Sequence, residues 1–298
     1  MKKSVSLLLA GLMLCGALTG CGGNNSTAEN TDSQTAEGGE STGMSGAIHV
    51  VSREDGSGTR GAFVELTGVE DDNGDNTTVE AEIANRTDAV LTTVAGNEAA
   101  IGYVSLGSLN DTVKAVTVDG VEATVDNVKS GDYTLSRPFN IATKGEPTGV
   151  AADFINFIMS ADGQAIVGED YITVNDNAEA FTSDGSSGHI TVGGSSSVSP
   201  VMEQLIEAYK AVNPNAQIDL QTSDSTSGMT GAMDGTFAIG MASRELKDEE
   251  AAELTGTAIA LDGIAVIVNT ANTVDNLTMD QIRSIYVGET TDWADVAA

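Results

Sequence analysis

The sequence predicts an α/β protein, because strand, turn and helix patterns follow one another along the chain. Three observations carry this prediction: short β-prone runs, Gly- and Ser-rich turns directly after them, and apolar residues at helical spacing after the turns. The strand and turn pairs are residues 48–51 with 53–60, 189–192 with 193–199, 217–221 with 223–228, and 237–241 with 242–244.

The first of these turns, Arg-Glu-Asp-Gly-Ser-Gly-Thr-Arg at residues 53–60, has the features of a site for a tetrahedral oxyanion. The first N–H groups of a helix lack intrahelical acceptors and carry the positive end of the helix dipole, and an anion satisfies both. The two glycines allow close backbone approach. Ser57 and Thr59 add short donors, and Arg53 can grip two oxygens with its planar fork.

A purely structural interpretation of the same turn is also open. In that interpretation Ser57 caps a surface helix and Arg53 pairs with Asp55. Serine and glycine populate turns anyway, so each turn alone is weak evidence. Four turns of one chemistry favour binding over coincidence. After the second strand and turn, Ser199 is expected to be the N-cap of a helix and Pro200 its first residue.

The charge of the chain constrains its ligands. Lys and Arg number 13 against 44 Asp and Glu, and the formal net charge is −31. Such a chain is not expected to bind nucleic acid, whose phosphates it would repel. This negative charge also repels an anion from a distance, so a bound anion must be held by donors close to it. That requirement favours a deep, enclosed cleft over a surface patch.

The N-terminus predicts export. Lys2 and Lys3 precede an apolar stretch at residues 5–18 that is short for a membrane span, so residues 1–20 are interpreted as a signal peptide. Leu-Thr-Gly-Cys at residues 18–21 resembles the bacterial lipoprotein cleavage box, which implies a lipid on Cys21; the alternative is an ordinary signal with a chance cysteine. Residues 21–46 are predicted to be a disordered tether, rich in Gly, Ser, Thr and Glu.

Enzymatic and metal-dependent functions find little support. The two cysteines, Cys15 and Cys21, fall in the signal and at the lipid position, so we expect no disulfide and no cysteine metal site. No general base accompanies Ser57, since the histidines, His49 and His189, are expected at strand starts. No EF-hand spacing is present, and no cofactor is expected. The charged run at residues 247–250 is interpreted as a solvated helix face.

The order of these motifs carries a resemblance to a known family. Residues 190–296 resemble the N-terminal half of the phosphate-binding protein of the bacterial ABC phosphate importer, and residues 47–174 resemble its C-terminal half. In that family the run Asp-Trp-x-Asp-Val, here at residues 292–296, continues into the Arg-x-Asp-x-Ser-Gly-Thr loop, which here opens the mature domain. The sequence therefore resembles a circular permutation, joined by a polar linker at residues 175–188.

The resemblance implies a type II periplasmic-binding-protein fold, in which two α/β lobes close on the ligand. One lobe is expected from residues 47–111 plus 270–298, and a continuous second lobe from residues 112–269, with hinges near residues 105–112 and 268–271. The chain termini should then meet in the lobe built from two segments. A monomer is expected, and a swapped dimer is the alternative.

The resemblance also implies the ligand contacts. Asp55 would orient Arg53. One departure concerns Ser243, which stands where some members of the family have an aspartate that accepts the proton of phosphate. Without that acceptor, sulfate is rejected less strongly; the alternative is that Asp55 serves as the acceptor, if Arg53 leaves one of its oxygens free. The implied ligand-binding residues are Arg53, Ser57, Gly58, Thr59, Ser196, Ser197, Ser225 and Ser243, with Thr226 as an alternative to Ser225.

The function expected from these features is that of a receptor on the outer face of the cell membrane. It would be anchored through Cys21, bind inorganic phosphate without chemical change and deliver it to the transmembrane subunits of an ABC importer. The alternatives are an oxyanion sensor or sequestering protein, or a receptor for sulfate or molybdate.

Overall fold

A computed structural model describes residues 44–296 of the chain. The predicted signal peptide, Cys21 and residues 22–43 of the predicted tether lie outside the described residues. Residues 44–46 were assigned to the tether, but they belong to the folded body: the N–H of Met44 donates to Thr273 at 2.7 Å, and the N–H of Gly46 donates to Asp292 at 2.9 Å. The predicted tether, residues 21–46, therefore overlaps the folded body at residues 44–46.

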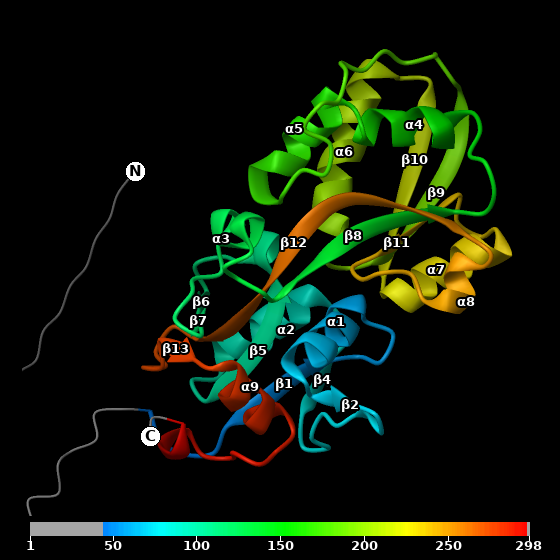
Figure 1. The fold of residues 1–298 in the computed structure, drawn as a ribbon. Coiled ribbons are helices and arrows are strands. Elements are labelled where there is room, and N and C mark those ends of the chain that lie inside the picture. The colour runs from blue at the N-terminus through cyan, green and yellow to red at the C-terminus, as the bar shows by residue number, and fades with distance from the viewer. Residues whose placement is uncertain (1–43, 297–298) are drawn as a thin grey trace, which may run out of the picture. The chain divides into compact units, whose positions relative to one another are not determined.

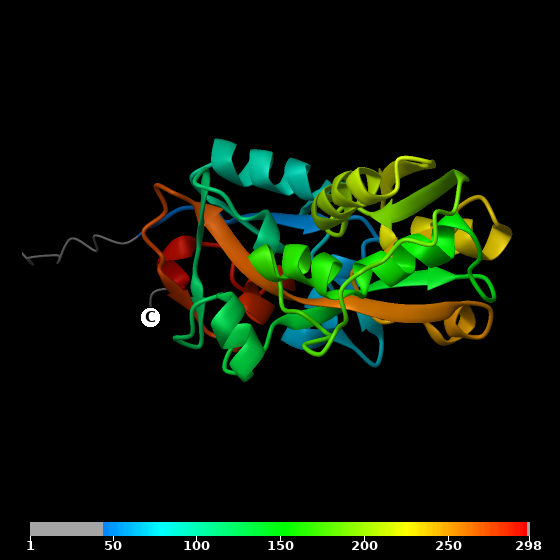
Figure 2. The same ribbon diagram turned by 90° about the horizontal axis from the view of Figure 1, so that it is seen from above.

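The described residues form two α/β lobes that share one long strand. In their nine-stranded sheet the order is β10-β9-β11-β8-β12-β5-β1-β4, and β6 pairs with β12. Strand β12 (Thr255–Asn269) pairs with β8 (Ser136–Thr143) through its first part and with β5 (Ala100–Ser105) through its last part. Figure 2 shows this strand running from one lobe into the other.

We call the lobe built from residues 44–135 and 264–296 the first lobe. Two buried clusters cover the two faces of its strands, one around Phe63, Tyr103 and Trp293, the other around Val51 and Val90. Besides β5 and the end of β12, its elements are β1 (His49–Arg53), α1 (Gly58–Thr67), β2 (Glu70–Asp71), β3 (Gly74–Asp75), β4 (Glu82–Ala84), α2 (Thr87–Gly96), η1 (Leu106–Ser108), β6 (Val113–Ala115), β7 (Thr117–Val118), α3 (Val125–Ser130), β13 (Asn276–Leu277), α9 (Met279–Tyr286) and η2 (Trp293–Asp295).

The second lobe is the continuous stretch of residues 136–263. Its larger core is built around Phe139, Phe154 and Tyr209, and a smaller one lies around Met229. Besides β8 and the start of β12, its elements are α4 (Val150–Ile158), α5 (Ala161–Asp170), β9 (Gly188–Ser195), α6 (Ser199–Val212), β10 (Ala216–Ser223), α7 (Ser225–Asp234), β11 (Ile239–Ala242) and α8 (Asp248–Ala251). Figure 1 shows α4, α5 and α6 on one side of these strands and α7 on the other.

The crossings between the lobes lie at β8 and β12, not near residues 105–112 and 268–271 as the sequence predicted. Strand β6 pairs with the end of β12, and Val116, Val128 and Leu135 belong to the large core cluster of the first lobe. Residues 113–135 therefore extend the first lobe. The physical reason is that β12 stays paired along its whole length, so the chain changes lobe inside a strand.

The two ends of the described chain meet in the first lobe, where the sequence resemblance placed them. Ala47 forms an antiparallel bridge with Asp292, and the N–H of Trp293 donates to the carbonyl of Gly46 at 2.9 Å. Figure 1 shows the blue start of the chain beside its red end. Both segments of the first lobe thus pair within one chain.

The linker at residues 175–188 is held by hydrogen bonds rather than looping freely. The carboxylate of Asp153 on α4 accepts from Ser183 Oγ at 2.7 Å and from the N–H of Asp184 at 3.0 Å. The same carboxylate accepts from Tyr209 OH at 2.7 Å, and Phe181 packs edge-on against Phe157. The linker is therefore fixed to the core of the second lobe.

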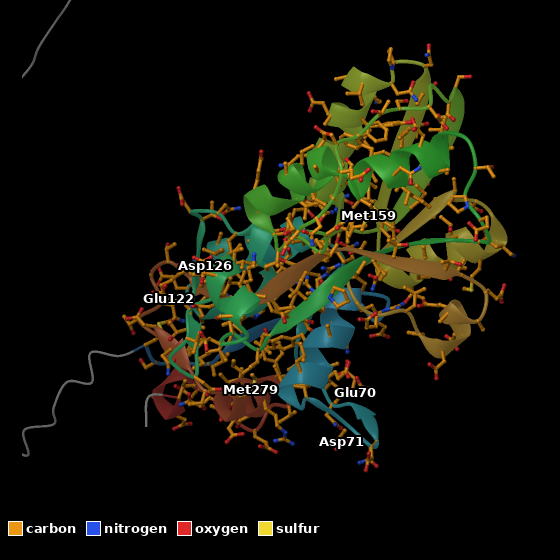
Figure 3. The ribbon with its side chains drawn as sticks, turned by 45° about the horizontal axis from the view of Figure 1, so that its top comes forward. Glu70, Asp71, Glu122, Asp126, Met159 and Met279 are labelled. Atoms are coloured by element: carbon orange, nitrogen blue, oxygen red, sulfur yellow. The ribbon has the colours of Figure 1, made fainter. Side chains whose placement is uncertain are left out.

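The surface of the first lobe carries much of the excess acid. Glu70 and Asp71 are exposed on the short β2–β3 ribbon, and Figure 3 shows them there, with Glu122 and Asp126 on another side of this lobe.

In the described part of the chain, no helix has the length and apolar character that a membrane crossing needs.

Candidate ligand-binding site

The four predicted turns meet where the two lobes touch. Strands β9, β10 and β11 are parallel, so their carboxyl ends lie at one edge of the second lobe. The turn after β1 faces this edge from the first lobe. The N–H of Thr226 donates to the carbonyl of Gly56 at 3.1 Å, and this backbone bond joins the lobes.

Buried hydroxyl groups from both lobes form one hydrogen-bonded cluster. Thr59 Oγ1, near the start of α1, lies 2.9 Å from Ser197 Oγ and 3.2 Å from Ser243 Oγ. Ser195 donates to Ser243 at 3.0 Å, and the N–H of Ser243 donates to Ser225 Oγ at 3.1 Å. All five side chains are at most 2% exposed. Hydroxyls both donate and accept, so such a cluster can rearrange around an oxyanion.

Arg53, at the end of β1, is buried beside this cluster. Its Nη2 donates to Ser196 Oγ at 3.1 Å, across the lobes. Its guanidinium donates hydrogen bonds to both carboxylate oxygens of Glu54, at 2.9 and 2.8 Å. The prediction that Asp55 orients Arg53 is wrong: Asp55 is exposed and pairs with Arg60 at 2.8 Å, because its side chain leaves the turn on the solvent side.

The end of β1 is fixed by Tyr103. The hydroxyl of Tyr103 accepts from the N–H of Arg53 at 3.1 Å and lies 2.9 Å from Ser52 Oγ. Burial raises the pKa of Tyr103 to about 12, so the hydroxyl stays neutral at ordinary pH. It places the arginine without adding charge.

Ser57 has the capping role that the structural interpretation gave it. It is the N-cap of α1, and its Oγ accepts from the N–H of Arg60 at 3.3 Å. Its own N–H donates to the carbonyl of Glu54 at 2.9 Å. Beyond it, the N–H groups of Gly58 and Thr59 begin the helix without intrahelical acceptors. They are the donors that α1 presents at the cluster.

Helix α6, which follows the second predicted turn, begins one residue earlier than predicted. Helix α6 has Val198 as its N-cap, so Ser199 is its first residue rather than the cap. Ser199 Oγ instead donates to the carbonyl of Ser195 at 3.1 Å and lies 2.8 Å from Thr222 Oγ1. Helix α7 starts at Ser225 with Asp224 as its cap, so it begins inside the turn predicted at residues 223–228.

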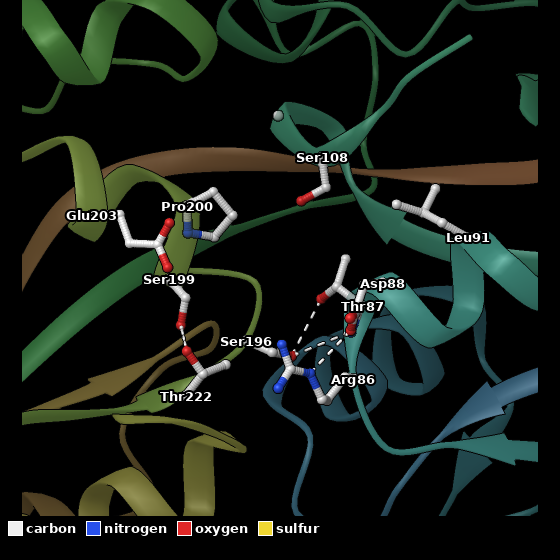
Figure 4. Close-up of a pocket in the computed structure, with 11 residues that line it drawn as sticks. Arg86, Thr87, Asp88, Leu91, Ser108, Ser196, Ser199, Pro200, Glu203 and Thr222 are labelled. Atoms are coloured by element: carbon white, nitrogen blue, oxygen red, sulfur yellow. Dashed lines mark hydrogen bonds and ion pairs between the residues drawn. The ribbon is translucent and has the colours of Figure 1, made fainter. Parts of the chain in front are cut away.

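Thr87 belongs to the cluster but was not among the predicted residues. Its Oγ1 lies 3.3 Å from Ser196 Oγ and 3.2 Å from Ser197 Oγ, and it is 6% exposed. The signal was present, since Thr87 opens α2 shortly after β4, which is again a hydroxyl at a helix start. Figure 4 shows Thr87 and Ser196 facing one another across the lobes.

An interlobe groove of about 300 Å³ runs past Thr87 and Ser196. Polar side chains from both lobes line it, and Arg86 is tied to Asp88 at 3.0 Å (Figure 4). Thr87 and Ser196 are the members of the hydroxyl cluster that line this groove.

Arg244 and Glu250 form a second buried pair at the lobe contact. Both oxygens of Glu250 accept from Arg244, at 2.7 and 2.8 Å, and Arg244 also donates to Thr226 Oγ1 at 3.3 Å. Burial opposes ionisation of Glu250, but the hydrogen bonds from Arg244 outweigh it and lower its pKa. Glu250 is 2% exposed, so the interpretation of residues 247–250 as a solvated face is wrong for this residue.

A third arginine, Arg137 on β8, reaches the cluster from the crossing between the lobes. It is 4% exposed and ion-paired with Asp262, its neighbour on β12, and its Nη2 lies 3.3 Å from Thr59 Oγ1. Sequence reasoning missed Arg137, because it sits inside a strand and no glycine or serine turn marks it.

The two histidines lie apart from the cluster. His49 is bound to Glu82 and His189 to Asp219, each at 2.8 Å and on the exposed surface. Within residues 44–296 no group of histidine, cysteine and acidic side chains is arranged to hold a metal ion. The cluster is thus built from hydroxyls, backbone N–H groups and paired arginines.

Comparison with known proteins assigns this architecture to a family. The family model described as the PBP superfamily domain matches residues 28–162 and 179–298. A protein of Streptococcus agalactiae serotype V named phosphate-binding protein PstS 2 is 46% identical over 303 residues, which is 99% of this chain and 98% of that protein. This chain belongs to the PBP superfamily and to its family of PstS phosphate-binding proteins.

Two further relatives place the chain within the PstS family. The crystal structure of a phosphate-binding protein of a phosphate ABC transporter from Streptococcus pneumoniae TIGR4 is 46% identical, with a TM-score of 0.68 over 84% of this chain and 100% of that chain. Phosphate-binding protein PstS of Bacillus subtilis strain 168 is 35% identical over 134 residues, which is 43% of this chain and 42% of that protein.

Proposed function

We propose that this chain is the extracytoplasmic receptor of an ABC phosphate importer, and that it binds inorganic phosphate between its lobes without changing it. The observation that carries the proposal is the buried hydroxyl cluster shared by both lobes at the start of α1. Such a cluster supplies the many short donors that a tetrahedral oxyanion needs. The names of the relatives reported above support phosphate as the ligand.

The proposed phosphate ligands come from both sides of the lobe contact. Arg53 supplies a guanidinium, and the start of α1 supplies backbone N–H groups and a hydroxyl. The second lobe supplies hydroxyls from the turns after β9, β10 and β11. The full set is Arg53, Ser57, Gly58, Thr59, Thr87, Ser196, Ser197, Ser225 and Ser243, with Glu54 in place of Asp55 as the group that orients Arg53.

Charge balance explains how a chain of net charge −31 can hold an anion. Each buried arginine near the cluster has a carboxylate partner: Arg53 has Glu54, Arg244 has Glu250 and Arg137 has Asp262. The anion is then held mainly by neutral donors in a site shielded from the surface charge. Enclosure between lobes makes those donors effective.

The choice between phosphate and sulfate depends on whether the site has a group that can accept a hydrogen bond from the ligand. Phosphate keeps at least one O–H near pH 7, whereas sulfate only accepts hydrogen bonds. Asp55 points away and the oxygens of Glu54 are engaged by Arg53, so a serine hydroxyl such as Ser243 is the proposed acceptor of the hydrogen bond that this O–H donates. A hydroxyl rejects sulfate less strongly than a carboxylate does.

We further propose that the chain is a circular permutation of the usual PstS order and is anchored through a lipid on Cys21. The end-to-end alignment with the S. agalactiae relative supports an order shared by both proteins. The B. subtilis relative aligns over less than half of either chain, which is what one collinear alignment of permuted halves would give. The transmembrane subunits of the importer are the proposed partners, and the receptor acts as a monomer.

The decisive experiment is calorimetric titration of the signal-free protein with phosphate, sulfate and molybdate, together with Arg53→Ala. We expect one phosphate per chain and a loss of at least a hundredfold in affinity for the variant, because a buried charge-assisted donor is removed. Tighter binding of sulfate or molybdate would reassign the ligand. A folded protein that binds none of the three would contradict the proposed function.

A further inference from the structure

Unsatisfied polar atoms gather where the chain crosses between the lobes. Arg137 Nε, Asp262 Oδ1, Tyr171 OH and Ser105 Oγ are buried and have no hydrogen-bond partner among the described residues. Arg137 and Asp262 face each other on β8 and β12, and Ser105 pairs with the next part of β12. Buried polar groups are nearly always satisfied, so a cluster of exceptions calls for a functional explanation.

The guanidinium of Arg137 is held in one orientation. One end donates to Asp262 and, at 2.9 Å, to the carbonyl of Gly263. Its central carbon lies 5.0 Å from the ring centre of Phe139. Its other end points to Thr59 Oγ1 at 3.3 Å, and Thr59 is the residue that contacts Ser197 and Ser243 of the opposite lobe. The arginine is thus aimed into the hydroxyl cluster.

Asp262, the carboxylate partner of Arg137, engages its arginine with fewer oxygens than Glu54 and Glu250 engage theirs. Glu54 and Glu250 each engage their arginine with both oxygens. Asp262 uses one oxygen, and the other is buried without a partner. Complete burial raises the pKa of Asp262, although Arg137 opposes the shift. Of the three arginines, Arg137 therefore has the carboxylate partner that engages it least completely.

We propose that Arg137 is a second cationic ligand-binding residue, which contributes its guanidinium to the oxyanion from the crossing strand while Asp262 positions it. This inference rests on the proposed function of the same site. It adds a positive charge in a part of the chain that belongs to neither the Arg-x-Asp-x-Ser-Gly-Thr loop nor the serine turns. It also joins anion binding to β8 and β12, the two strands that connect the lobes.

The test compares Arg137→Gln with Asp262→Asn by calorimetric titration of phosphate, with circular dichroism and thermal unfolding to establish folding. Arg137→Gln should weaken phosphate binding about tenfold to a hundredfold, because a charge-assisted donor is lost. Asp262→Asn keeps an acceptor for Arg137 and removes a negative charge behind it. Because Asp262 positions Arg137 but does not itself contact the anion, affinity should fall less for Asp262→Asn than for Arg137→Gln, which loses the guanidinium itself.

A purely structural ion pair predicts a different result. In that case both variants lose stability and both bind phosphate alike, and an affinity within twofold of the unchanged protein for folded Arg137→Gln would overturn the inference. If Arg137→Gln does not fold, the neutral double variant Arg137→Gln/Asp262→Asn decides: a tenfold loss supports the inference and equal affinity overturns it. Failure of the unchanged protein to bind phosphate would instead contradict the proposed function.

Discussion

At the scale of single residues, two neighbouring acids have opposite environments. Glu54 turns inward and holds the buried guanidinium of Arg53, with its side chain 21% exposed. Asp55 turns outward, 96% exposed, to Arg60. Removing one partner of a buried pair leaves a charge without compensation, whereas an exposed pair contributes little. The two positions should therefore respond very differently to the same chemical change.

We predict that Glu54→Gln lowers the free energy of unfolding by about 1–3 kcal/mol, because Arg53 loses its ionised partner. The matched variant Asp55→Asn should change it by less than about 1 kcal/mol. Urea unfolding of the ligand-free protein measures both. Equal losses at the two positions would show that Glu54 does not hold Arg53.

The sequence could predict the residue types of the site but not these pairings. The hydroxyls Thr59, Ser196, Ser197 and Ser243 meet as the turn patterns indicated. Whether Glu54 or Asp55 reaches Arg53 depends on how the turn leaves β1, and nothing in residues 53–60 fixes that direction. Local pattern predicts which groups lie in a turn, and only the folded backbone decides where each side chain points.

At the scale of elements, the linker at residues 175–188 depends on one buried carboxylate in α4. Burial by itself would raise the pKa of Asp153, but hydrogen bonds from Ser183, Tyr209 and the N–H of Asp184 outweigh it and lower the pKa below 3.8. The sequence showed a polar linker and gave no sign of this attachment, because its partners lie on α4 and α6. The attachment limits the freedom of the segment between α5 and β9.

We predict that Asp153→Asn lowers the free energy of unfolding by about 2–3 kcal/mol at pH 7, because several hydrogen bonds to a charged acceptor are weakened. A group whose pKa is lowered by folding stabilises the protein above its unfolded pKa of 3.8, and the contribution is lost as the pH falls through the folded value. The difference between the two proteins should therefore shrink below about pH 4. Urea unfolding between pH 3 and pH 7 measures it.

Asp162→Asn is the matched control for this prediction. Asp162 is exposed on α5 and also accepts from the linker, through the N–H of Phe181 at 2.7 Å. Its replacement should cost less than about 1 kcal/mol, since exposed interactions contribute little. A loss for Asp153→Asn that is no larger, or that does not change with pH, would contradict the role of Asp153.

At the scale of the whole molecule, the two lobes and the meeting of the chain ends follow from the order of the sequence motifs. The positions of the crossings between the lobes did not follow from the sequence. Strand β12 is one uninterrupted strand, and only its partners, first β8 and then β5, show where the chain passes from one lobe to the other. The lobes share β12, which changes its partner from β8 to β5 between Gly263 and Ile264. The contact between the lobes is then decided by how closely the turns can approach.

Gly58 lies where the turn after β1 comes close to the second lobe. A Cβ added there would be 2.4 Å from Ser225 Oγ and 3.0 Å from Ser243 Oγ, both in the other lobe. Ser225 cannot easily yield, because it is fully buried and accepts the N–H of Ser243. A methyl group at this position would therefore hold the lobes apart, while the first lobe alone would tolerate it.

We predict that Gly58→Ala weakens phosphate binding at least about tenfold and leaves the thermal stability of the ligand-free protein nearly unchanged, because the clash arises only when the lobes meet. Gly61→Ala, one turn along α1, is the matched control, since its added Cβ would have no neighbour nearer than Arg244 Cδ at 4.0 Å. Calorimetry and small-angle scattering with saturating phosphate measure the two effects. If Gly58→Ala bound phosphate as Gly61→Ala does and contracted equally, closure would not require the contact between α1 and the second lobe.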